Sequence, residues 1–294
     1  MMTIHGLKLL AAAAALSMAS GLATAAEPLR LAVTDLEGLE NLQREFGAFK
    51  EVLEKTTGYP FKFYPVASRT AAAEALRSEK VEFVLTGPAE YVVIRKKTEA
   101  RAIVGFGRPD YFSGIVVLAD SGINTVADLK GKKVAFGDVG STSNHLAPMQ
   151  VLADYGIDPR ASLQAMHVHR NVAWEGLKRG DVAAAGMNYG YILKFRANEK
   201  SLEPGAFKVI ARGPDLPNDV LMAGKHVDAK VVETVRKAFV DHSKDLVAAI
   251  LTGEDNQKYK GMKFLPDVKD SDYDYVRSMY RTIGFPQFAD FVGN

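Results

Sequence analysis

Short apolar strands alternate with amphipathic helices along this chain, and the alternation restarts once. The first set opens with the strand-like segment LRLAVTD (residues 29–35), and the amphipathic stretch 42–58 that follows it ends at a glycine. Further along, Pro88 directly follows the apolar run VEFVLTG, at the position that proline favours in the first turn of a helix. Strands and helices in this order predict an α/β fold with mostly parallel sheets covered on both faces.

The second set begins with VADLKGKKVAFGD (126–138) and runs to FKVIARG (207–213). DVLMAG (219–224) then reads as a strand returning to the first set, and the remainder is helical, with an amphipathic run at 231–251 and a last helix near 271–282. We therefore expect two lobes with a cleft between them. Lobe 1 comprises residues 27–111 plus 219–294, and lobe 2 comprises residues 112–218.

The N-terminus carries the pattern of a secretory signal peptide. Lys8 precedes the apolar run LLAAAAALSMASGLATA, which ends in the small residues Ala23-Thr24-Ala25. The run is too short and too interrupted for a membrane span, and the alternative is a buried N-terminal helix. We expect residues 1–25 to be cleaved near Ala25 and the mature protein to be periplasmic.

Composition excludes several kinds of protein. The chain has no cysteine, so it contains no disulfide, no cysteine metal site and no lipid-modified cysteine. Its 37 basic residues nearly balance its 35 acidic ones, which gives no sign of a nucleic-acid-binding surface. It also lacks a nucleotide P-loop, a Gly-x-Ser-x-Gly elbow and a His-Glu-x-x-His motif, so we expect neither an enzyme nor a bound cofactor.

Three hydroxyl residues in a row, Ser141, Thr142 and Ser143, follow the strand-like VAF and precede a helix. Loops at the carboxyl ends of strands bind ligands in open α/β sheets, and a helix N-terminus offers free N–H groups and a partial positive charge. Gly140 permits a close approach of the backbone, and Pro148 keeps the regular helix from starting much before Asn144 or His145. The loop is therefore an oxyanion site, or one hydroxyl merely caps the helix.

Three segments resemble the phosphate-, phosphite- and phosphonate-binding proteins of ABC importers. They are DSGINTVADLKGKKVAFGDVGSTSNHLAPMQVLADYGIDP (120–159), EALRSEKVEFVLTGPAEYVV (74–93) and LPNDVLMAG (216–224). The resemblance runs from about Leu29 to Gly284. It implies a type II periplasmic binding protein fold, whose two lobes close like a hinged clamp on a small tetrahedral anion held by the hydroxyls of residues 141–143.

The resemblance also implies further ligand-binding residues. Tyr111 matches an aromatic hydroxyl donor of the pocket, with a plain core residue as the alternative. Asp219 matches an acidic residue at the second hinge strand, with a turn shared with Asn218 as the alternative. A carboxylate there repels an anion unless the ligand brings a proton, so Asp219 is predicted to disfavour fully ionised sulfate. Family members often have a pocket histidine near the position of His169. The local spacing is one residue short, so either His169 or Arg170 takes this role.

Other candidates are less tightly tied to the family pattern. Asn188 and Tyr189 lie at the end of a strand where phosphonate binders carry an acid for a ligand amine, and the absence of an acid there argues against an aminoalkyl phosphonate. Arg69 either binds a carboxylate or phosphate through two N–H groups of its guanidinium, or is a solvated surface residue. His167 and His169 alternate along a strand, which suggests a metal pair, but no cysteine or acid accompanies them and we predict no metal.

These observations leave three functional hypotheses. The first is a solute-binding protein, acting as a monomer, that delivers a phosphorus oxyanion to an ABC permease in the inner membrane. The second is a sensor subunit of the same fold that signals to a membrane histidine kinase. The third, a hydrolase using Ser141, His169 and Asp219, fits the clustered hydroxyls less well.

Overall fold

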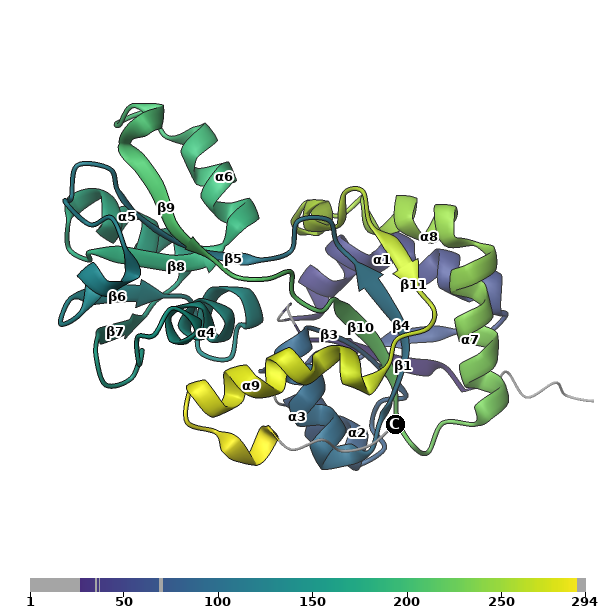
Figure 1. Cartoon of the computed structure of the whole chain (residues 1–294). Coiled ribbons are helices and arrows are strands. Elements are labelled where there is room, and N and C mark those ends of the chain that lie inside the picture. Colours follow the sequence, from purple (N-terminus) through teal and green to yellow (C-terminus); the bar gives the residue numbers. More distant parts are fainter. Residues whose placement is uncertain (1–26, 35, 37, 69–70, 290–294) are drawn as a thin grey trace, which may run out of the picture.

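The computed structural model describes residues 27–34, 36, 38–68 and 71–289. The predicted signal peptide and Arg69 lie outside these residues. Within them, no helix is both long enough and apolar enough to cross a bilayer. The chain forms two lobes, each built on one β-sheet (Figure 1).

The first lobe contains a six-stranded sheet. Its strands, in spatial order, are β11 (Lys263–Leu265), β4 (Arg101–Gly107), β10 (Asp219–Ala223), β3 (Phe83–Thr86), β1 (Leu29–Val33) and β2 (Phe61–Phe63). One face packs against α1 (Leu39–Thr57), α7 (Ala229–Asp241) and α8 (Ser243–Ile250). The other face packs against α2 (Ala71–Arg77), α3 (Pro88–Thr98) and α9 (Asp274–Thr282). Apolar side chains that alternate along β1 and β3 therefore enter two separate cores.

The second lobe contains a five-stranded sheet. Its strands, in spatial order, are β7 (Gln164–His167), β6 (Lys133–Phe136), β8 (Ala184–Asn188), β5 (Ser113–Leu118) and β9 (Phe207–Arg212). One face is covered by α4 (Ala147–Asp154), and the other by α5 (Arg170–Arg179) and α6 (Tyr189–Asn198). Trp174 is buried beneath this second layer and stacks on Phe207 at 4.3 Å between ring centroids.

Both sheets are mixed, and most strands of each sheet run in one direction, as predicted. β10 runs antiparallel to its neighbours β3 and β4, and β5 runs antiparallel to β8 and β9. The chain crosses between the sheets through residues 107–113 and 212–219, and β5 and β10 directly follow these crossings. A strand that enters from the other lobe has no crossover helix to turn it round, so it inserts opposite to the βα-connected strands.

The structure differs from the sequence-based expectation in two places near the C-terminus. The amphipathic run at 231–251 forms two helices, α7 and α8, because the chain turns at His242. The strand β11 was not predicted, since three residues with one half-buried side chain give almost no periodic signal.

The helix α9 belongs to the first lobe but also contacts the second (Figure 1). The Thr282 hydroxyl donates to Gln150 Oε1 on α4 at 2.6 Å, and the Tyr275 hydroxyl donates to Asp154 Oδ2 at 2.9 Å. The Tyr280 hydroxyl reaches the carbonyl of Ala89 at the start of α3. α9 therefore connects the first turns of α3 to the helix that follows the hydroxyl loop.

Candidate ligand-binding cleft

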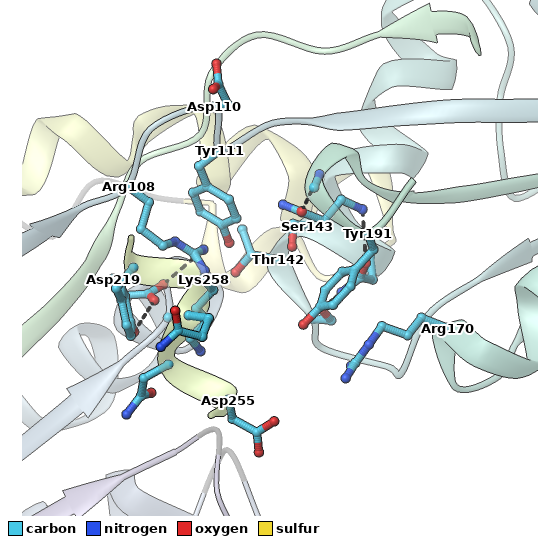
Figure 2. A pocket seen from close by; sticks show the side chains of 18 of the residues that line it. Arg108, Asp110, Tyr111, Thr142, Ser143, Arg170, Tyr191, Asp219, Asp255 and Lys258 are labelled. Carbon is cyan, nitrogen blue, oxygen red and sulfur yellow. Dashed lines mark hydrogen bonds and ion pairs between the residues drawn. The ribbon is translucent and has the colours of Figure 1, made fainter. Parts of the chain in front are cut away.

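A cleft of about 580 Å3 lies between the lobes (Figure 2). Two walls can be distinguished by the lobe that supplies them. The first-lobe wall comprises Thr86, Gly87, Glu90, Arg108, Asp219 and residues 254–259. The second-lobe wall comprises Ser141, Thr142, Ser143, Asn144, Arg170, residues 188–191, Leu193 and Lys194. Tyr111 lines the cleft from the first crossing between the sheets.

The hydroxyl loop begins with a π-helical turn over Thr142–Leu146, and the regular helix α4 starts only at Ala147. The N–H groups of both His145 and Leu146 donate to the carbonyl of Ser141 at 3.0 Å. Pro148 lies in the first turn of α4, so the regular helix begins later than the sequence predicted. π-Turns are frequent at functional sites, and the first N–H groups of such a turn have no acceptor within the helix.

The three hydroxyls of the loop differ in their partners. Thr142 Oγ1 accepts from the N–H of Ala89 at 2.9 Å, across the two lobes, so it can still donate to a ligand. Ser141 Oγ accepts from Asn144 Nδ2 at 3.3 Å. For the Ser143 hydroxyl, no hydrogen bond is found within the described part of the chain, and the residue is 8% exposed and faces the cleft. Ser143 is therefore the hydroxyl best placed to receive an anion.

Asn144 and His145 hold the conformation of the hydroxyl loop. The sequence did not predict what these two residues do there. Asn144 Oδ1 accepts from the N–H of Asn188 at 3.0 Å, which ties the loop to the end of β8. His145 Nδ1 accepts from the N–H of Gly140 at 3.0 Å. Burial, and next the neighbouring His167, lower the pKa of His145 to about 4. The imidazole is therefore neutral at physiological pH and can keep accepting this hydrogen bond.

On the first-lobe wall, Asp219 is buried and fully engaged. The Tyr259 hydroxyl donates to its Oδ2 at 2.6 Å, and Arg108 NH2 lies 3.5 Å from its Oδ1. Arg108 also stacks on Tyr111, with Cζ 3.5 Å from the ring centroid. Asp219 therefore does more than shape the turn with Asn218. Its charge is partly offset by Arg108, which weakens the repulsion that the sequence suggested.

On the second-lobe wall, the cleft is lined by Arg170 and not by His169. His169 is the N-cap of α5, and its exposed ring turns back to accept from the N–H of Asn171. It also lies beyond the end of β7, so it does not share a strand face with His167. Arg170 instead stacks on Tyr191, with Cζ 4.4 Å from the ring centroid. Among the described residues, no group of three His, Asp or Glu side chains gathers as a metal site would require.

Asn188 and Tyr189 both line the cleft, as expected from their place after β8. The Asn188 side chain caps α6 by accepting from the N–H of Gly190 at 2.9 Å. Tyr189 stacks on Phe112 at 4.5 Å between centroids. Asn188 Oδ1 and the Tyr189 ring therefore have structural partners, whereas no hydrogen bond of the Asn188 Nδ2 or of the Tyr189 hydroxyl is found among the described residues.

Several lining residues were missed by sequence reasoning. Arg108 lies three residues before Tyr111 in the first crossing. A basic residue in a segment that joins the two lobes could have been predicted to line the cleft. Glu90 is buried in the first turn of α3. Tyr259 and Lys258 come from a short 3-10 helix (Asp255–Tyr259), which is held by the buried carboxylate of Glu45 through the N–H of Asp255 at 2.9 Å. No motif in the sequence connects that segment to the cleft.

Comparison with known proteins identifies the family. Residues 32–273 match the model of the periplasmic substrate-binding protein of phosphonate ABC transporters. The chain is 26% identical to the phosphate-import protein PhnD of Mycolicibacterium smegmatis over 228 residues, covering 72% of this chain and 71% of that one. It is 28% identical to the phosphonates-binding periplasmic protein of Escherichia coli, also over 228 residues, covering 74% and 66%.

Solved structures support the same fold. PhnD1 from Prochlorococcus marinus, determined in complex with methylphosphonate, superimposes with a TM-score of 0.66 at 16% identity, covering 87% of this chain and 98% of that one. The proteins of the matching family bind substrates for transport and are not enzymes. The chain therefore belongs to the periplasmic substrate-binding proteins of phosphonate ABC transporters.

Proposed function

We propose that this protein binds a small phosphorus oxyanion in the cleft by closure of its two lobes, and passes it to an ABC permease as a monomer. The names of two relatives, a phosphate-import protein and a phosphonates-binding protein, agree with this ligand class. The phosphoryl oxygens are held by the hydroxyls of residues 141–143. Residues 1–25 are removed as a signal peptide on export, so the mature chain begins at Ala26 or Glu27.

The observation that carries the proposal is the hydroxyl loop itself. Ser141, Thr142 and Ser143 line the cleft at the start of a π-turn, whose first N–H groups have no acceptor within the helix. Hydrogen bonds of Asn144 and His145 hold the conformation of this turn. Preorganised neutral donors suit an oxyanion, because each bond to a charged oxygen is stronger than a neutral one. Tyr111 brings a phenol group to the same cleft.

The test is direct binding. Protein purified from periplasm is unfolded, and its released ligand is identified by mass spectrometry. Refolded ligand-free protein is then titrated by calorimetry with methylphosphonate, phosphite, phosphate and sulfate. We expect stoichiometric binding of at least one phosphorus oxyanion without turnover, and a higher melting temperature in its presence. If no phosphorus oxyanion binds, the ligand class is wrong.

A further inference from the structure

The second-lobe wall carries two cations that the oxyanion loop does not use. Arg170 is half-buried at the first turn of α5, and its guanidinium stacks on the ring of Tyr191. Lys194 lies on α6, one turn after Tyr191. Both cations line the same cleft as the hydroxyl loop. Figure 2 shows Arg170 and Tyr191 on the wall that carries Ser143, with Asp255 on the opposite side.

These cations differ from others in the second lobe in their partners. Lys178 pairs with Glu175 and Glu199, and Arg179 pairs with Asp181. For Arg170 and Lys194, no carboxylate lies within 4.0 Å in the part of the chain that the structure describes. The second-lobe wall contains no Asp or Glu at all. Stacking on Tyr191 holds the guanidinium in place while its N–H groups stay available for a planar anion.

The size of the cleft allows a second contact. A volume of about 580 Å3 is typical of clefts that enclose whole organic ligands. A tetrahedral phosphoryl group held at the hydroxyl loop fills only part of it. The rest of the ligand would then lie along the wall formed by Tyr191, Arg170 and Lys194.

We infer that Arg170 and Lys194 form a second anion subsite, and that the protein takes an organophosphorus anion whose organic part ends in a carboxylate. This inference rests on the proposed function, since the phosphoryl group occupies the hydroxyl loop. The planar carboxylate receives two N–H groups of Arg170, and Lys194 adds a point charge. A ligand with an amine in the same place meets two like charges on this wall.

The test compares ligands of similar size. Calorimetry measures 3-phosphonopropionate, propylphosphonate and 2-aminoethylphosphonate, which end in a carboxylate, a methyl group and an ammonium group. We expect 3-phosphonopropionate to bind at least tenfold more tightly than propylphosphonate, the effect of one good charge-assisted contact. The 2-aminoethyl ligand is expected to bind most weakly. Equal affinities, or tightest binding of the amine through the acids of the first-lobe wall, would overturn the subsite while leaving the phosphoryl site intact.

A matched pair of variants locates the contact. Arg170→Gln should weaken 3-phosphonopropionate at least tenfold and propylphosphonate less than threefold. Arg179→Gln, on the same helix but outside the cleft, should change neither. An equal loss for both ligands in Arg170→Gln would mean that the residue acts through general attraction or lobe closure, and would overturn the subsite. If neither phosphonate nor inorganic phosphate binds the wild-type protein, the proposed function fails together with the inference.

Discussion

The two walls of the cleft treat charge in opposite ways. On the first-lobe wall, the carboxylate of Asp219 is buried, forms an ion pair with Arg108 and accepts a hydrogen bond from the Tyr259 hydroxyl. On the second-lobe wall, neutral hydroxyls and helix N–H groups stand beside Arg170 and Lys194, with no acid among them. Removing one partner of a buried ion pair leaves an uncompensated charge and is strongly destabilising, whereas neutral donors bind an anion without a buried counter-ion. The first-lobe wall therefore mainly supports the fold, and the second-lobe wall mainly attracts the ligand.

The largest effect should come from breaking the pair on the first-lobe wall. Arg108→Met leaves the buried Asp219 carboxylate without a counter-ion among the described residues. We expect it to lower the free energy of unfolding of the ligand-free protein by about 3–5 kcal/mol. Arg170→Gln, a change of similar kind on the second-lobe wall, should stay within about 0.5 kcal/mol of wild type. Urea denaturation measures both.

A second substitution checks the cause. Asp219→Asn added to Arg108→Met removes the uncompensated charge, so most of the lost stability should return. If Arg108→Met and Arg170→Gln lowered the free energy of unfolding equally, the proposed difference between the two walls would be wrong.

The second-lobe wall should instead depend on pH, through His145. Its folded pKa of about 4 lies below the unfolded value of about 6.5, so the unfolded chain binds the extra proton between these values. The stabilisation is complete above about pH 6.5 and is lost as the pH falls towards 4, by about 3 kcal/mol. Protonation at Nδ1 also removes the acceptor for the Gly140 N–H, so ligand affinity should fall only as the pH approaches 4, where the folded protein takes up this proton.

Unfolding free energies at several pH values test this. His145→Phe keeps a buried ring and should lose the slope between pH 6.5 and 4. His242→Phe, at an exposed position between α7 and α8, should keep it. A slope that persists in His145→Phe would assign the pH dependence to other groups.

Within the hydroxyl loop, Ser143 and Thr142 should separate binding from stability. Ser143→Ala removes a hydroxyl that faces the cleft, and should weaken methylphosphonate by about 1.5–3 kcal/mol, roughly tenfold or more, with stability unchanged. Thr142→Val also removes the acceptor of the Ala89 N–H, so it should additionally cost about 1 kcal/mol of stability. Changes under twofold in affinity for both variants would reduce the loop to a helix cap.

The sequence predicted the hydroxyl loop from its place after a strand, where chain order and spatial position agree. Tyr111 and Asp219 were predicted from the resemblance to the family, and both line the cleft. The sequence did not predict cleft residues whose position depends on tertiary contacts. The segment with Tyr259 reaches the cleft only because Glu45 anchors it, and the pairing of Arg108 with Asp219 joins residues 111 positions apart. The reversed direction of β5 and β10 was not predicted for the same reason, since these two strands follow the crossings between lobes.

The smallest expected effect concerns selectivity at Asp219. A bare carboxylate would demand a proton from the ligand, and affinity would collapse as the pH rises through the ligand's last ionisation. Because Arg108 offsets much of that charge, we expect only a fewfold decline for methylphosphonate across this range, and only a modest preference over sulfate. Asp219→Asn should narrow the preference for methylphosphonate over sulfate by about two- to fivefold, because Arg108 already offsets much of the charge that the substitution removes. Asp110→Asn, an exposed acid that also lines the cleft, should leave it unchanged. Calorimetry with methylphosphonate and sulfate tests whether Arg108 offsets the charge of Asp219. A preference of a hundredfold or more that vanishes in Asp219→Asn would mean that the carboxylate still repels the ligand at full strength. The first-lobe wall would then select the ligand as well as support the fold.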